Sequence, residues 1–261
     1  MKLPCLRLWF SAAPRLGVGE DRFGKPGYNQ PMTASPIVAA LKAHRGEMTS
    51  VVPFDLARGE VVVFDFTEAN RELAHLDIND VSGFTEYLFE SVAEAEIPVG
   101  IGRYDEDRVL YRHSPLFNGT AERRSIHIGI DLFVVEGTEI LAPLPATVHS
   151  AANNVGLGNY GPTVILHHQL DGIEFHTLYG HLSRASIDRL RPGKTLSAGD
   201  TVGEVGDLQE NGSWPPHLHF QIITETLGEE VDYPGVAAPS ERERFLELCP
   251  DPNLILGIPG L

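Results

Sequence analysis

Residues 120–225 constrain the fold more than any other stretch of the chain. Short apolar runs alternate there with Gly, Pro and Asn, a texture typical of strands joined by tight turns. The step Gly137–Ile140 (GTEI) has a counterpart in Gly199–Val202 (GDTV), and each lies beside a segment of small and apolar residues. We therefore expect a mostly β fold in which these steps belong to hairpins of an antiparallel β-sheet or sandwich.

The preceding residues, 32–115, predict a small α+β unit. Glu60–Phe66 (EVVVFDF) is rich in β-branched and aromatic residues, as strands are. Residues 79–96 place apolar side chains on one helical face and acidic ones on the other. Val99–Tyr104 and Arg108–Tyr111 are expected to be further short strands.

The two ends of the chain have their own character. Residues 1–31 carry five basic and two acidic side chains and are rich in Gly and Pro, which predicts a poorly ordered arm. This arm is a poor secretory signal, so a cytoplasmic location is expected rather than export. Residues 234–261 predict a Pro-rich tail with a short helix at Ser240–Leu248. The central β domain is then expected over residues 116–233.

Composition narrows the class of protein. A chain of 261 residues suits one domain with an appendage, or two small domains. Hydrophobic residues make up 42%, which excludes wholesale disorder, and no apolar run approaches the roughly 20 residues of a membrane span. The net charge of -16 argues against nucleic acid or anionic lipid as the main partner. The oligomeric state is left open.

Histidine is the unusual residue, because eight of the eleven fall between His127 and His219. Two motifs stand out, HIGID at residues 127–131 and HLH at residues 217–219. On a strand, side chains at positions i and i+2 share a face about 6.6–7 Å apart. HLH therefore suits one metal ligand with a neighbouring acid–base group, and the spacing does not say which histidine is which.

The first motif must bend to contribute two ligands. In an extended strand His127 and Asp131 would lie about 13 Å apart, too far for metal bonds of about 2 Å. Gly129 between them permits the bend. One imidazole and one carboxylate from here, with one imidazole from HLH, make a three-ligand set. Three ligands with an open fourth position are typical of catalytic zinc, and no cysteine lies near to make a structural site.

A third element is Tyr179–Leu182 (YGHL), at the end of a strand expected over Ile173–Tyr179. His181 supplies a further imidazole. Two imidazoles beside a metal suit amide hydrolysis, in which one removes a proton from water and a protonated one stabilises the oxyanion. The remaining histidines of the region are expected to be structural, with one of the pair at 167–168 supporting the site: His149, His167, His168 and His176.

These motifs resemble those of the lysostaphin/LytM-type zinc metalloendopeptidases, which are peptidoglycan DD-metallopeptidase-like. That family shows H-x-x-x-D, then Tyr-x-His-Leu, then H-x-H before an aromatic residue. HIGIDLF, TLYGHL and PPHLHF occur here in the same order, within about residues 120–225. The resemblance implies an antiparallel β-sheet groove fold and a peptide or peptidoglycan-fragment substrate. It also implies a Zn²⁺ ion and the following site: ligands His127, Asp131 and His219, and catalytic residues His181 and His217.

Two departures keep alternatives open. Relatives commonly carry a Gly- and Ser-rich turn before H-x-H, where this chain has Glu210–Pro216 (ENGSWPP), so the substrate rim differs. The stretches TLYGHLSRAS, ENGSWPPHLHFQI and LCPDPNLIL also resemble a peptidase-like module of larger chains that join kinase-like phosphotransferase and class III aminotransferase modules. A cytosolic zinc hydrolase of a small peptide or amide is therefore the alternative, and a non-catalytic scaffold is another. The complete ligand set favours a hydrolase.

Overall fold

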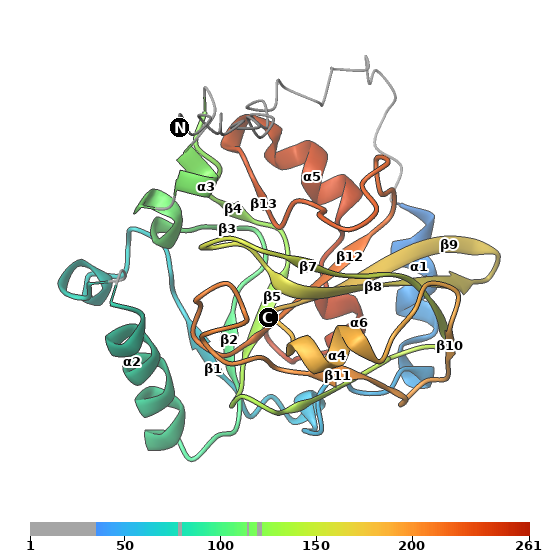
Figure 1. Ribbon diagram of the computed structural model, residues 1–261, viewed down its shortest axis with the longest axis horizontal. Helices are drawn as coiled ribbons and strands as arrows, with labels where there is room; N and C mark the ends of the chain where they lie inside the picture. The colour runs from blue at the N-terminus through green and yellow to red at the C-terminus, as the bar shows by residue number, and fades with distance from the viewer. Residues whose placement is uncertain (1–34, 78–79, 114, 119–121) are drawn as a thin grey trace, which may run out of the picture. The chain divides into compact units, whose positions relative to one another are not determined.

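A computed structural model describes residues 35–77, 80–113, 115–118 and 122–261 (Figure 1). The arm expected at residues 1–31 lies outside the described residues. Within the described part, no helix combines the length and the apolar character needed to cross a membrane.

An eight-stranded sheet organises the fold (Figure 1). All neighbouring strands pair antiparallel except β1 and β2, which are parallel. The mostly β fold class with an N-terminal α+β segment is confirmed, but the sheet is mixed rather than purely antiparallel. In spatial order its strands are β1 (Val62–Phe64), β2 (Gly100–Gly102), β5 (Ile130–Phe133), β12 (Leu218–Ile223), β9 (Ile173–Gly180), β8 (Gly161–Leu170), β7 (Ala146–Asn154) and β10 (Thr195–Leu196).

Two smaller sheets flank the large one. The repeated steps at 137 and 199 form β6 (Glu139–Leu141) and β11 (Thr201–Glu204), which pair antiparallel with each other. The two steps therefore do not form separate hairpins as expected. They pair with each other in one antiparallel ladder, although they are distant in the sequence. The other small sheet has the order β13 (Val236–Ala237), β4 (Ile126–His127) and β3 (Glu106–Asp107).

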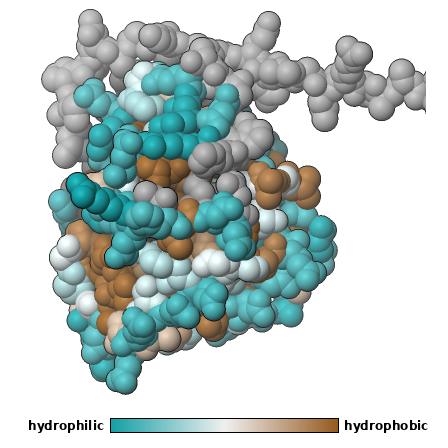
Figure 2. All heavy atoms as spheres, turned by 90° about the vertical axis from the view of Figure 1, so that its left-hand side faces the viewer, coloured by the Kyte–Doolittle hydropathy of each residue, from teal (hydrophilic) through white to brown (hydrophobic). Residues whose placement is uncertain are grey.

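The parallel β1–β2 pair follows from its connection. Helix α2 (Val81–Glu94) lies between the two strands in sequence, and a helical crossover returns the chain in the same direction. Asp80 caps this helix by accepting a hydrogen bond from Gly83 N at 3.2 Å. The face that carries α2 is mostly hydrophilic, with smaller apolar areas (Figure 2), in keeping with the amphipathic helix that the sequence predicts.

The prediction of a strand at Arg108–Tyr111 is wrong. The strand β3 ends at Asp107, and Val109–His113 forms the 3-10 helix η4. Arg108 turns its side chain into a buried ion-pair network, and Val109 N donates to Phe66 O at 3.0 Å, so the chain leaves the ladder here.

Helices cover the two faces of the large sheet. On one face, α1 (Pro36–Ala43), α4 (Arg184–Asp188) and α6 (Asn253–Leu256) pack over a core that includes Leu166 and Tyr179. On the other face, α5 (Arg242–Leu248) places Phe245 in a cluster with strand residues. The short helix expected at Ser240–Leu248 is therefore present. The remaining helical turns are η1 (Arg45–Glu47), η2 (Leu56–Arg58), η3 (Glu72–His75), α3 (Pro115–Asn118) and η5 (Pro239–Glu241).

Candidate metal centre

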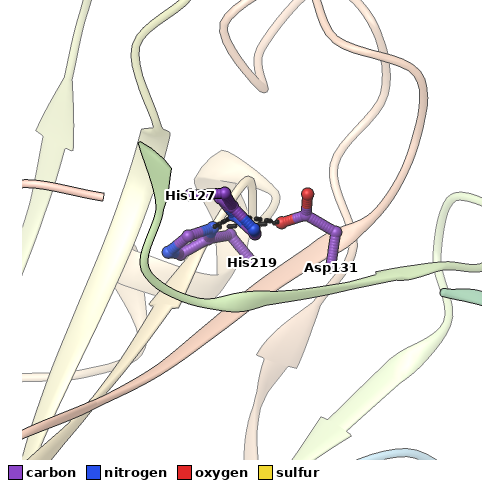
Figure 3. A group of neighbouring side chains, drawn as sticks. All are labelled: His127, Asp131 and His219. Atoms are coloured by element: carbon purple, nitrogen blue, oxygen red, sulfur yellow. Dashed lines mark hydrogen bonds and ion pairs between the residues drawn. The ribbon is translucent and has the colours of Figure 1, made fainter. Parts of the chain in front are cut away.

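Three side chains from three strands converge on one point. His127 ends β4, Asp131 lies in β5, and His219 lies in β12 directly opposite Asp131 in the antiparallel ladder. Figure 3 shows the two imidazoles and the carboxylate pointing toward one another. All three residues are at most 3% exposed. The structure thus brings together the three ligands that the sequence analysis expected.

Gly129 allows the approach, though for a different reason from the one expected. Its φ angle is not among the positive ones, so no unusual backbone conformation demands glycine. Instead, a Cβ atom at this position would lie 2.5 Å from His219 Cε1 and 2.6 Å from His219 Nε2. The absence of a side chain therefore leaves the space that the His219 ring occupies.

The spacing of the converging atoms fits a small cation. Asp131 Oδ1 lies 3.2 Å from His127 Nε2 and 3.0 Å from His219 Nδ1, and the two nitrogens are 3.0 Å apart. A tetrahedral ion with bonds of about 2 Å would hold its ligand atoms roughly 3.3 Å apart. Small outward adjustments of the three side chains would seat the ion.

The outer hydrogen bonds determine which nitrogens carry protons. His127 Nδ1 donates to Arg103 O at 2.9 Å, and His219 Nε2 donates to Gln221 Oε1 at 3.0 Å. The Gln221 amide group itself donates to Pro234 O, which fixes its orientation. In the neutral imidazoles the inner nitrogens are consequently bare acceptors facing a carboxylate oxygen. Three acceptor atoms without a hydrogen between them are an arrangement that a cation satisfies.

Electrostatics keeps His127 and Asp131 deprotonated. Burial, reinforced by the charge of Arg108, lowers the pKa of His127 to about 4. The pKa of Asp131 lies well below its usual value, because the attraction of His127, Arg108 and His217 outweighs the effect of burial. At neutral pH the site therefore offers a neutral imidazole and a carboxylate, which are the forms that bind metals.

The two candidate catalytic histidines lie next to this centre. The ring centroids of His181 and His217 are 4.2 Å apart, and His217 Nε2 lies 3.8 Å from Asp131 Oδ1. His181 Nδ1 donates to Asn211 O at 2.7 Å, and His217 Nδ1 donates to Pro215 O at 2.6 Å. Each Nε2 is therefore left as an acceptor. Burial lowers the pKa of both imidazoles, which are neutral at pH 7.

Part of the sequence around this site matches a known protein family. Residues 125–233 match Peptidase family M23. Over these residues the chain is similar to that family.

Individual relatives cover only parts of the chain. A curated protein of Haemophilus influenzae, described as an uncharacterized metalloprotease, is 31% identical over 158 residues. The alignment covers 56% of this chain and 31% of the relative, so this chain spans about a third of that protein's length.

Two solved structures are also similar in sequence. The catalytic domain of the prophage-encoded M23 protein EnpA from Enterococcus faecalis, solved as a mutant, is 27% identical, with a TM-score of 0.33 over 42% of this chain and 76% of that chain. The catalytic domain of lysostaphin from Staphylococcus simulans is 24% identical, with a TM-score of 0.29 over 44% of this chain and 77% of that chain.

A cavity of about 150 Å³ adjoins the candidate metal centre. Trp214 lines it together with Tyr160 and Tyr233. Residues that precede the M23 match also line it, among them Tyr111 and Phe117, whose ring centroids are 4.6 Å apart. The Tyr160 hydroxyl is buried without a hydrogen-bond partner in the described structure. An unpaired hydroxyl at a cavity wall suits a contact with substrate.

Sequence reasoning missed what the segment Glu210–Pro216 does. Beyond differing from the family's turn, it supplies the carbonyl groups that orient His181 and His217. Asn211 fixes the segment, because its side chain donates to Trp214 O at 2.9 Å and accepts from Trp214 N at 3.1 Å. His181 itself has a φ of 62°, a conformation that non-glycine residues adopt rarely and that occurs at functional sites.

Arg108 and Gln221 were missed as well. The place of Gln221 beside His219 could have been predicted from the sequence, since it lies two residues after His219 on the same strand and therefore on the same face. The place of Arg108 could not have been predicted, because its position beside Asp131 depends on the pairing of β3 with β4. Neither member of the pair His167–His168 supports the site as expected. His168 bonds Pro145 O and Thr177 Oγ1, and His167 has Glu174 as its nearest charged partner.

Proposed function

We propose that the protein is a zinc-dependent metallopeptidase that hydrolyses peptide or other amide bonds. The observation that carries the proposal is the convergence of three bare acceptor atoms, each held by a separate outer partner. Two imidazoles and one carboxylate, with no cysteine among them, form a donor set that zinc hydrolases use while keeping a fourth position open. In this proposal His127 Nε2, Asp131 Oδ1 and His219 Nδ1 hold Zn²⁺. The ion would supply Lewis acidity, which lowers the pKa of water and polarises a carbonyl group.

His217 is proposed as the general base. Its Nε2 is an acceptor on the metal side of the ring, 3.8 Å from Asp131 Oδ1, because Nδ1–H is used by Pro215 O. A neutral imidazole in this orientation accepts a proton from the attacking water. The proton is then available for the leaving amine, so the group acts as base and afterwards as acid.

His181 is proposed to stabilise the oxyanion. Its Nδ1–H is held by Asn211 O, so Nε2 donates to an oxyanion only after it takes up a proton. The close contact of the two rings lets the proton taken from water pass from His217 to His181 while the oxyanion exists and return to His217 for the leaving amine. Because its resting pKa is well below 6.5, His181 becomes cationic only when negative charge develops beside it.

Peptides of the peptidoglycan type are the substrate class that the resemblance to lysostaphin/LytM-type endopeptidases favours. The test is hydrolysis of purified cross-linked muropeptides by the zinc-loaded protein, with His217→Ala as the control variant. Cleavage by the parent protein and not by the variant supports this substrate class. A folded, zinc-loaded parent that leaves muropeptides intact contradicts it.

A small cytosolic peptide or amide is the second candidate substrate, and the enclosure of the site favours it. His127, Asp131, His181, His217 and His219 are each at most 5% exposed. The cavity of about 150 Å³ is smaller than the roughly 300 Å³ at the lower end of ligand pockets. A panel of dipeptides and simple amides tests this candidate. Turnover there without muropeptide cleavage supports it, and no turnover of either set indicates a non-catalytic scaffold.

We also propose a cytoplasmic location, which fits the second candidate better than the first. Detection of the protein in the soluble cytosolic fraction of its source cells, and its absence from the secreted fraction, is the expected result. Recovery outside the cytoplasmic membrane would contradict the proposal and strengthen the peptidoglycan assignment.

A further inference from the structure

Arg108 contacts the metal centre from outside the part of the chain that matches family M23. Its Nη1 donates to Asp131 Oδ2 at 2.5 Å, and its Nε donates to Glu106 Oε2 at 2.9 Å. Both Arg108 and Glu106 have side chains only 3% exposed. A guanidinium group is thus buried directly behind a carboxylate that faces the metal position.

The contact divides the two oxygens of Asp131 between different tasks. Oδ1 faces His127 Nε2 and His219 Nδ1, whereas Oδ2 is taken by Arg108. With Oδ2 held, the carboxylate offers a cation one oxygen rather than two. Without the guanidinium, rotation about the Cβ–Cγ bond would let either oxygen, or both, approach the ion.

The backbone is arranged to admit this pair. Gly102 in β2 lies directly opposite Asp131 in the ladder, and a Cβ atom there would be 2.6 Å from Arg108 Nη2. Arg103 O accepts from Arg108 Nη2 at 3.2 Å and also from His127 Nδ1 at 2.9 Å. One carbonyl group therefore connects the guanidinium to a second ligand of the centre.

The buried charges balance in a way that preserves the site for a cation. Glu106 is held by Arg108 and by Phe66 N, which donates to Glu106 Oε1 at 3.1 Å. The charges of Glu106 and Arg108 cancel, which leaves the negative charge of Asp131 for the ion. Arg108 alone would repel the metal, so the glutamate is part of the arrangement.

From this geometry we propose that Arg108 is a positioning residue of the metal centre, which holds Asp131 so that it binds the ion through Oδ1 alone. The inference rests on the proposed metal site and extends it, because it makes residues before the M23 match part of the centre. Outer partners of metal ligands typically contribute a factor of about 10–100 in metal affinity.

The experiment compares two variants that leave the net charge unchanged. Glu106→Gln/Arg108→Met removes the donor to Asp131 together with both cancelling charges. Arg108→Lys keeps a cationic donor that can reach the carboxylate. Zinc affinity is measured by competition with a chromophoric chelator, and the visible absorption of the Co²⁺-loaded protein reports the coordination number. Arg242→Gln is the matched control, because it removes an exposed arginine that pairs with Asp105 on a neighbouring segment.

We expect the double variant to bind zinc about 10–100 times more weakly than the parent protein. The visible absorption of its Co²⁺-loaded form should also be lower, because Asp131 can then offer the ion both oxygens. Arg108→Lys should recover most of the affinity, and Arg242→Gln should match the parent. Parental zinc affinity and an unchanged Co²⁺ spectrum in the double variant would overturn the proposal. The proposal would also be overturned if both Arg108 variants lost zinc affinity equally and their metal-free forms unfolded at an equally lowered temperature. That result would show a purely structural role for Arg108.

These outcomes are distinct from failure of the proposed function. If the parent protein binds no zinc, the metal site itself is wrong. If the parent binds zinc and hydrolyses amides while the double variant does the same, only the role of Arg108 is wrong.

Discussion

The protonation pattern of the metal centre is determined by single acceptor groups on its outer side. Arg103 O and Gln221 Oε1 each accept from the outer nitrogen of one imidazole. Arg108 performs the corresponding task for Asp131 by donating to Oδ2. Every ligand atom thus faces inward without a proton, and each residue of the set is individually testable.

Replacing a ligand should abolish metal binding. We expect Asp131→Asn and His219→Ala each to reduce bound zinc from one equivalent to none, because two remaining ligands do not hold the ion. Zinc per folded protein is measured by atomic emission after gel filtration. His167→Asn is the control, since this half-buried histidine makes no contact with the centre. Full zinc occupancy in both ligand variants would refute the site.

The Tyr160 hydroxyl should contribute to turnover rather than to folding. Burial raises its pKa well above 10, so it remains a hydrogen-bond donor, and it has no partner among the described residues. We expect Tyr160→Phe to lower kcat/KM by about tenfold, with zinc content and unfolding temperature retained. Tyr179→Phe is the control, because that hydroxyl accepts from Thr177 Oγ1 outside the cavity. An unchanged kcat/KM in Tyr160→Phe would contradict the assignment.

His168 should make the metal-free protein sensitive to acid. Burial lowers its pKa to about 4, whereas the unfolded chain has the ordinary value of 6.5. Between these values the unfolded state binds more protons, so stability falls as the pH drops from about 6.5 to about 4. Between pH 7 and pH 5 we expect His168→Gln to lose about 2 kcal/mol less unfolding free energy than the parent. Urea titrations in EDTA measure this, and identical pH dependence in both proteins would show that His168 is not the responsible group.

The identity of the site residues was largely predictable from the sequence, but their supports were not. H-x-x-x-D and H-x-H identify side chains by type and order. They do not say which histidine of the second motif faces the centre. The register of β12 against β5 decides this, because it places His219 opposite Asp131 and leaves His217 before the strand begins. Arg108 comes from a segment whose local pattern resembled a plain strand.

At the scale of elements, the bend between β4 and β5 creates the centre. The chain leaves β4 at His127 and re-enters the large sheet at Ile130, so two ligands four residues apart lie side by side. The sequence indicated a bend at Gly129 but not its cause, which is the His219 ring from another strand. The sequence likewise showed the two strands of the β6–β11 ladder only as two similar motifs, GTEI and GDTV, since a local pattern does not say which strands pair.

Adding a single methyl group at the bend should therefore damage the centre. In Gly129→Ala the new Cβ would lie 2.5 Å from His219 Cε1, so the ring must move away from Asp131. We expect zinc affinity to fall at least tenfold, a larger effect than the small change expected in Gly46→Ala, where no atom lies within 4 Å of the new Cβ. Isothermal titration with zinc measures both variants. Equal affinities in the two would show that the bend tolerates a side chain.

At the scale of the whole molecule, residues before the M23 match complete the sheet and the site. Strand β2 pairs with β5 along Gly100–Gly102, and β1 adds to its far side. The sequence predicted these strands but not their place, because the α2 crossover and the pairing with β5 are non-local. The division of the chain at residues 115 and 116 stays a prediction, and the shared sheet gives it a measurable consequence.

The described part of the chain should unfold as one cooperative unit. Removing β1 and β2 would expose the edge of β5 and the apolar residues packed on it, including Phe133. We expect far-UV and near-UV circular dichroism to give coincident urea midpoints for the full chain. A fragment that begins at residue 116 should be insoluble or unfolded. Two separate transitions, or a folded fragment, would establish independent domains.

Zinc-dependent hydrolysis at this centre is tested most directly by titrating the metal-free protein with Zn²⁺ while amide hydrolysis is followed on the muropeptide, dipeptide and amide substrates. We expect the rate to rise linearly and to stop rising at one equivalent of Zn²⁺, and His217→Ala to bind the same equivalent without turnover. Hydrolysis that is independent of zinc, or equal turnover by His217→Ala, would contradict this expectation.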